Sequence, residues 1–350
     1  MAEGDEPARR PRRVELVRWG VGLVIGVLSV WVAFAVAGGL RDATDALRQL
    51  DGGWLLAGLG IEAFSYFVLG VKLRQLVGVD VVSNAEAVEL GLVLSGFGLL
   101  TPARPAEGLA LVASHLRRRG LSKRRITMAF GFAEWFSTRV FLLVSSINLI
   151  VVAAIENDPI SDLWPLLAAA VLVLLVLAAT ARLAVKPGAV ERLGQVAGAL
   201  RRPSRRRSVE ERRFAAAAWH SEAKAFIGPP RHRAGIAVLT AVASLADVGC
   251  LWFALRAAGA GVGFDVALLA MTVAAVSSLV PFVPGGLGIA EAAIPAVANH
   301  FGVPYEQGLA AAVAYRVLGT FIPAAVGALA IVGLRRYAVA SPQESASEVM

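Results

Sequence analysis

The sequence predicts an all-α polytopic membrane protein, and three observations carry that prediction. The 350 residues are 57% hydrophobic, with a mean hydropathy of +0.66. Apolar runs of about 20 residues recur, which is the length that roughly 30 Å of hydrocarbon requires. Lysine and arginine are concentrated between those runs. Together they predict about six full transmembrane helices plus two oppositely oriented re-entrant broken-helix hairpins in an inverted repeat. Eight simple spans are the alternative.

The first membrane half is predicted over residues 19–181, after a basic cytoplasmic N-terminus of residues 1–18. Its full spans are expected at residues 19–40, 52–71, 126–155 and 163–181. A cleaved signal peptide is the alternative for the first run, because Ala35-Val36-Ala37 resembles a cleavage site. That run is longer than the roughly 7–15 apolar residues of a signal peptide, so a span is favoured.

Residues 85–116 are predicted to form the first hairpin. The segment is apolar except for Glu86 and Glu89, breaks at TPARP (residues 101–105, with Pro102 and Pro105), and then resumes. An unpaired backbone group in hydrocarbon costs several kcal/mol, so such breaks persist where protein buries them or a polar cavity adjoins them. The pattern indicates a helix, a broken tip and a returning helix.

A basic cytoplasmic loop is predicted over residues 182–233. Ser208 and Glu211 form a capping box, which predicts a short amphipathic helix on the membrane surface. The arginines at 201, 202, 205, 206 and 207 would attract anionic headgroups, or act only as an orientation anchor.

The second membrane half is predicted over residues 234–333, followed by a cytoplasmic tail of residues 334–350. Its full spans are expected at residues 234–257 and 307–332, with the second hairpin at 265–301. Residues 280–291, VPFVPGGLGIAE, break this hairpin with two prolines and three glycines: Pro281, Pro284, Gly285, Gly286 and Gly288. Broken helices near the midplane commonly form substrate or ion sites in transporters. The alternative is that the glycines are positions of tight helix packing.

The distribution of positive charge orients these elements. With both hairpins re-entrant, 28 lysines and arginines lie on the cytoplasmic side, and only Arg41 and Arg48 lie opposite. The positive-inside rule therefore predicts a multi-pass protein of the cell (plasma) membrane with both termini in the cytoplasm. The hairpins then enter from opposite faces. Gly120 precedes Glu134 by 14 residues and Gly302 precedes Arg316 by 14, in keeping with an inverted repeat.

Charged residues inside the predicted spans are candidates for function, because charge at membrane depth is expensive. Glu62 is one of them, and the candidate substrate-binding set is Arg104, Glu107, Glu134, Arg139, Asp247, Glu291 and Arg316. A pocket of Arg104, Arg139 and Arg316 would suit a phosphate, which guanidinium groups bind bidentately. The helix N-termini after both breaks would add partial positive charge. In the alternative interpretation the arginines only neutralise carboxylates and hold helices together.

Several function classes find no support. The single cysteine, Cys250, allows no intrachain disulfide, and the four histidines show no ligand spacing, so we expect no metal and no cofactor. No ATP-binding loop of the form GxxxxGK[ST] is present. Acidic and basic residues are scattered over different segments, so we expect no enzyme. The net charge of +8 is read as an orientation signal and not as a nucleic-acid interface.

The motifs together resemble the lysylphosphatidylglycerol synthase transmembrane-region family of flippase-like proteins. The resemblance rests on VPFVPGGLGIAE, on TPARPAEG with the downstream RRRGLSKRR, and on Tyr315-Arg316, and covers roughly residues 15–338. It implies movement of an aminoacylated phosphatidylglycerol or polyprenyl-linked lipid between leaflets. The soluble aminoacyl-transferase domain of the bifunctional members is not expected, nor is synthase activity.

The chain departs from the family pattern at three places. Ala106 and Ala110 replace a glycine and an arginine of the first motif, and a Glu-Arg-x-x-Asp motif appears as EWFST at residues 134–138. These losses affect the expected substrate class more than the fold. A secondary transporter of a small anion and a non-transporting membrane scaffold are the alternatives. Expected partners are membrane lipids with anionic headgroups and, as a candidate, a separate lipid-modifying enzyme. Nothing in the sequence indicates an oligomeric state.

Overall fold

The computed structural model describes residues 45–94, 106–155, 171, 175, 230–277 and 289–339. Every regular element within those ranges is a helix, so the predicted all-α class is confirmed. Four described helices are long and apolar enough to cross a membrane: Gly52–Val77, Lys123–Val152, Arg231–Ala257 and Tyr305–Leu334. They coincide with four of the six predicted spans. The predicted spans at 19–40 and 163–181 and most of the basic loop lie outside the described residues.

The chain divides into two compact units. The first comprises Met1–Tyr66, Glu89–Val112 and Leu245–Arg336, and the second comprises Phe67–Val88, Ala113–Ser244 and Tyr337–Met350. Helices α3 (Gly52–Val77), α4 (Asn84–Leu92), α6 (Ala106–Arg118) and α11 (Pro230–Ala257) contribute to both units, whereas α7 (Lys123–Ile155) lies in the second.

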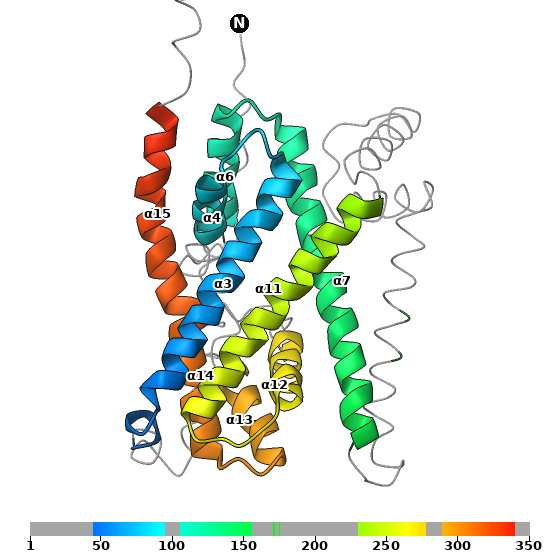
Figure 1. The fold of residues 1–350 in the computed structure, drawn as a ribbon, viewed down its shortest axis with the longest axis vertical. Helices are drawn as coiled ribbons and strands as arrows, with labels where there is room; N and C mark the ends of the chain where they lie inside the picture. The colour runs from blue at the N-terminus through cyan, green and yellow to red at the C-terminus, as the bar shows by residue number, and fades with distance from the viewer. Residues whose placement is uncertain are drawn as a thin grey trace, which may run out of the picture. The chain divides into compact units, whose positions relative to one another are not determined.

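Two short helices of the first unit flank the second predicted break. Helix α12 (Phe264–Ser277) has 14 residues and α13 (Ile289–His300) has 12, and the two pack against each other (Figure 1). At 1.5 Å per residue they measure about 21 and 18 Å, less than the roughly 30 Å that a span needs. Two short arms in mutual contact are the geometry that a helical hairpin requires. The break itself, residues 278–288, lies outside the described residues.

The arms of the first predicted hairpin also lie side by side. A Cβ added to Gly108 of α6 would come within 3.0 Å of the carbonyl oxygens of Val93 and Leu94, just beyond the end of α4. The returning arm can approach this closely because Gly108 has no side chain. The intervening tip, including Pro102, Arg104 and Pro105, lies outside the described residues.

Matching turns follow the two returning arms. Gly120 after α6 has φ +85° and Gly302 after α13 has φ +81°, a left-handed conformation that glycine adopts without a steric penalty. In both turns the residue after the glycine donates its N–H to the carbonyl five positions earlier, which is the Schellman arrangement. The positions paired by the predicted sequence symmetry therefore have the same local geometry.

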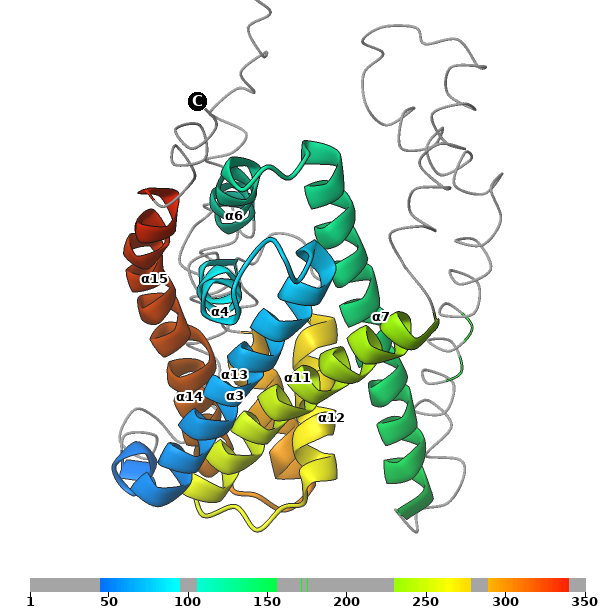
Figure 2. The same ribbon diagram turned by 45° about the horizontal axis from the view of Figure 1, so that its top comes forward.

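One long apolar helical segment follows the Gly302 turn. Helix α14 (Tyr305–Arg316) continues through a π-helical turn, η3 (Val317–Phe321), into α15 (Ile322–Val339), and both views show the helices following one another (Figures 1 and 2). The sequence predicted this span without predicting its π-helical turn.

Gly308 sets how closely α13 and α14 approach. A Cβ at this buried position would lie 2.8 Å from the backbone Cα of Pro295. We expect Gly308→Val to lower the free energy of unfolding by about 1–3 kcal/mol, because overpacking forces the backbones apart. Thermal unfolding of the purified protein in detergent measures the loss. Gly60→Ala is the matched control, since nothing lies within 4 Å of the Cβ it would add. Equal stability of the Gly308 variant and wild type would contradict the close packing.

Candidate functional site

The candidate site lies in the first unit, where α14 ends in Tyr315 and Arg316 and the π-helical turn begins. In that turn the N–H of Ile322 donates to the carbonyl of Val317, five residues earlier. Such turns widen a helix locally and occur frequently at functional sites. Gly319 lies against the ring of Tyr315, and a Cβ there would come within 3.2 Å of its Cε2 atom. The helix is therefore irregular directly after the two polar side chains.

Arg316 forms an ion pair with Glu291. The guanidinium Nε donates to the carboxylate Oε1, and the side chains are only 14% and 12% exposed. Glu291 stands in the first turn of α13, directly after the predicted Pro-Gly break. The ion pair thus ties the start of a hairpin arm to the end of α14, and both members keep a small accessible surface.

Tyr315 connects three helices at the same level. Its hydroxyl donates to Oδ1 of Asp247 on α11 over 2.9 Å, and lies 3.7 Å from the sulfur of Met271 on α12. Asp247 also interacts electrostatically with Arg316. The structure thus brings three of the predicted residues, Asp247, Glu291 and Arg316, into one cluster.

Glu62 of α3 completes this cluster. Its side chain interacts with Cys250 and, electrostatically, with Asp247, and the residue is only 4% exposed. Its Oε2 atom is buried and has no hydrogen-bond partner among the described residues. One turn earlier, Gly58 allows α3 to pack closely, since a Cβ there would lie 3.1 Å from Leu318 and 3.4 Å from Phe253.

The cluster contains three carboxyl groups, one guanidinium, one phenol and one thiol, supplied by α3, α11, α13 and α14. Within the described part of the chain, no group of three histidine, cysteine, aspartate or glutamate side chains could hold a metal ion. Chemically, the arrangement offers an arginine whose carboxylate partner an anionic ligand can displace.

Of the other predicted site residues, two belong to the second unit, and the side chains of the remainder lie outside the described residues. Glu134 and Arg139 belong to α7 in the second unit, where the Arg139 guanidinium lies 3.8 Å from the centre of the Trp135 ring. Lys72 donates to Ser137 over 3.1 Å and interacts electrostatically with Glu134. Glu107 lies in α6, but its side chain, like Arg104 and the prolines and glycines of both breaks, lies outside the described residues. The three-arginine pocket stays a prediction.

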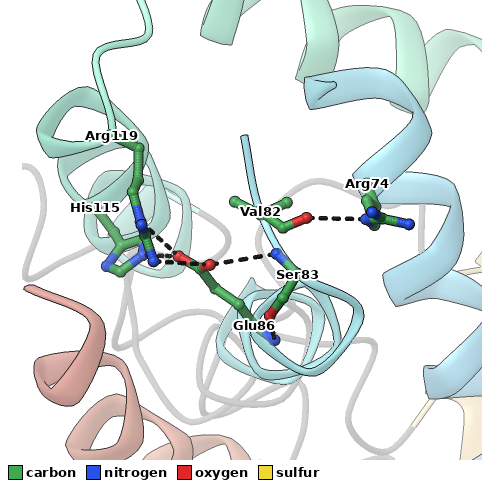
Figure 3. Close-up of polar contacts among 6 residues, drawn as sticks. All are labelled: Arg74, Val82, Ser83, Glu86, His115 and Arg119. Atoms are coloured by element: carbon green, nitrogen blue, oxygen red, sulfur yellow. Dashed lines mark hydrogen bonds and ion pairs between the residues drawn. The ribbon is translucent and has the colours of Figure 1, made fainter. Parts of the chain in front are cut away.

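A buried polar network in the second unit was missed by the sequence analysis (Figure 3). Glu86 of α4, which is 1% exposed, accepts two hydrogen bonds from Arg119, each of 3.0 Å, and lies 2.6 Å from Nε2 of His115. The N–H of Glu86 donates to Ser83 Oγ over 3.2 Å, and the N–H of Ser83 donates to Glu86 Oε2 over 3.4 Å. This reciprocal pair is a capping box at the start of α4.

Arg74 holds the turn that precedes this network. Its guanidinium donates to the carbonyls of Val79 and Val82 and to the side chain of Asn84, over 2.8, 2.9 and 3.1 Å. The Ser-x-x-Glu spacing at residues 83–86 is the sequence signal that would have identified the cap. Because each oxygen of Glu86 is already occupied, the network serves to join α4 to the end of α6, the two arms of the first predicted hairpin.

Comparison of the sequence with known protein families adds one finding. A family model described as the lysylphosphatidylglycerol synthase TM region matches residues 19–327 of the chain. No curated protein sequence matches it. The matched range includes the Glu62, Asp247, Glu291 and Arg316 cluster and both predicted breaks.

Proposed function

Because the chain belongs to the lysylphosphatidylglycerol synthase transmembrane-region family, we propose that it is a flippase-like translocator. Its cargo is a phospholipid or polyprenyl-phosphate-linked lipid, which it moves between the leaflets of the cell membrane. The observation that carries the proposal is the Arg316–Glu291 ion pair, placed between a short hairpin arm and a π-helical turn.

The ion pair supplies a place for an anionic headgroup. Arginine binds phosphate bidentately, so a lipid phosphate competes effectively with the single carboxylate of Glu291. The N-terminus of α13, where Glu291 stands, adds partial positive charge. The headgroup therefore binds by displacing Glu291 from Arg316, and the ion pair re-forms when the lipid leaves.

Apolar surface adjoins the arginine and favours a lipid over a small anion. Val317 and Phe321 of the π-helical turn are 41% and 51% exposed, and Leu329 of α15 is 72% exposed. A lipid contacts both features, since its headgroup binds Arg316 while its acyl chains cover the apolar side chains. A small anion would bind the arginine alone and leave the apolar side chains uncovered.

In this proposal the two pairs of short arms are re-entrant hairpins that enter the membrane from opposite faces, and both termini are cytoplasmic. Translocation then follows from alternating exposure of the Arg316 site to the two leaflets, as in transporters built from inverted repeats with broken helices. The protein moves its lipid without chemically changing it. A separate lipid-modifying enzyme supplies or consumes the cargo.

Native mass spectrometry of the lipids retained by the purified protein tests the headgroup site. We expect wild type to retain one anionic lipid class selectively. Arg316→Ala should lower that selectivity at least tenfold, because the loss of one hydrogen bond to a charged group costs about 1.4 kcal/mol or more of binding free energy. Arg48→Ala removes a side chain that is 79% exposed and is the matched control.

Selective retention by wild type and the Arg48 variant, lost in the Arg316 variant, supports the proposal. The same bulk membrane lipid in all three samples would contradict it and would favour the scaffold.

A further inference from the structure

Glu62 and Asp247 place two further carboxyl groups beside the Arg316 ion pair. Both carboxyl groups belong to the first unit, where Glu62 on α3 is buried and Asp247 on α11 is half-buried, and the two interact electrostatically. Glu62 is 4% exposed, and its Oε2 atom has no hydrogen-bond partner among the described residues. A buried carboxylate with an unoccupied oxygen is expensive, and no lysine or histidine in the described part of this cluster offsets it.

Among the described residues, the charges around the two carboxyl groups do not balance. The groups that face them are Tyr66 from α3, Cys250 from α11, and Tyr315 and Arg316 from α14, with Glu291 of α13 behind Arg316. Arg316 is the sole cation among these groups, and Glu291 already pairs with it. Two further carboxylates side by side would add two negative charges to an apolar interior, which a bound proton relieves.

We propose that the Glu62 and Asp247 carboxyl pair binds one exchangeable proton, and that release of this proton drives the lipid off Arg316. The proton binding stands on the cluster alone, whereas the coupling rests on the proposed function. A proton suits this site better than a metal ion, because no three acidic, histidine or cysteine side chains among the described residues are placed so that they could hold a metal ion together. One carboxyl oxygen is sufficient to accept it.

Asp247 is the point through which the coupling acts. It accepts the hydrogen bond of Tyr315 and interacts with Arg316, the next residue along α14. With the proton bound, the carboxyl pair carries one negative charge less, so Arg316 attracts an anionic headgroup more strongly. When the proton leaves to water, the added negative charge of the carboxyl pair repels the headgroup and attracts the Arg316 guanidinium. Lipid and proton therefore bind together and leave together.

Infrared spectroscopy of the full-length protein tests the proton site without requiring transport. We expect wild type to show a pH-dependent C=O stretching band of a protonated carboxylic acid, and Glu62→Gln to lose it. Asp247→Asn is the second variant, expected to shift or remove the same band. Asp45→Asn changes a side chain that is 64% exposed, and is the control that keeps it. A wild-type band that neither substitution in the cluster changes, or no band at any pH, would overturn the proton site.

Proteoliposomes that contain fluorescent phosphatidylglycerol test the coupling. With an imposed pH gradient, wild type is expected to accumulate the lipid in the leaflet facing the alkaline side, and reversing the gradient should reverse the accumulation. Glu62→Gln should lose this response. Lipid movement in wild type that ignores the gradient would overturn the coupling and leave the proposed function standing. A carboxylic acid band without any lipid movement would overturn the coupling and the proposed function together.

Discussion

Replacing Glu86 with alanine is expected to lower the free energy of unfolding by about 3–5 kcal/mol, the largest stability loss that the described structure predicts. Removal of one partner from a buried ion pair leaves the other uncompensated. Here it leaves both His115, which is 6% exposed, and the Arg119 guanidinium without their carboxylate. It also removes half of the capping box of α4. Unfolding in mixed micelles, followed by circular dichroism, measures the loss.

Arg118→Ala is the matched control for the Glu86 variant. Arg118 belongs to the same end of α6 as His115 but is exposed, so its loss should change stability by no more than about 0.5 kcal/mol. Similar small losses in the two variants would mean that the Glu86 network does not hold α4 and α6 together.

A double-mutant cycle on Arg316 and Glu291 is expected to separate folding from function. Arg316→Ala alone should lower the free energy of unfolding by about 3 kcal/mol, because it removes the ion-pair partner of Glu291, whose side chain is only 12% exposed. Glu291→Ala alone should cost a similar amount. The double variant should recover most of the loss, since replacing both members of a buried pair with apolar groups is often close to neutral.

Thermal unfolding of the four proteins in one detergent measures this coupling. Additive losses, with the double variant the least stable of the four, would show that the two side chains do not interact in the folded protein. The cycle also yields a folded protein that lacks Arg316, which the transport test requires.

The helices themselves follow from the sequence. The apolar runs at 52–71, 126–155, 234–257 and 307–332 are each long enough to satisfy their backbone groups internally in hydrocarbon, and all four lie in helices. The turns at Gly120 and Gly302 also follow from residue type, because their positive φ is a backbone conformation that other residues adopt only with strain. Residue type and local hydropathy are sufficient to predict such helices and turns.

The pairing of polar groups did not follow from the sequence, because it depends on which helices meet. Glu62 and Asp247 are 185 residues apart, and nothing in either segment indicates that they lie together. Glu86 and His115 belong to different helices, α4 and α6, so their contact depends on how those helices pack. The π-helical turn after Arg316 likewise has no distinguishing composition, since VLGTF is also compatible with an ordinary helix.

The central claim is that Arg316 binds the headgroup of a lipid that the protein moves between leaflets. The most direct measurement is dithionite quenching of fluorescent phosphatidylglycerol in proteoliposomes of wild type and of the Arg316→Ala, Glu291→Ala double variant. We predict that wild type exposes the inner-leaflet lipid to dithionite within minutes, and that the folded double variant leaves it protected, as in protein-free vesicles. Equal quenching by both proteins beyond the protein-free level would contradict the role of Arg316, and wild-type quenching no greater than that of protein-free vesicles would contradict lipid translocation itself.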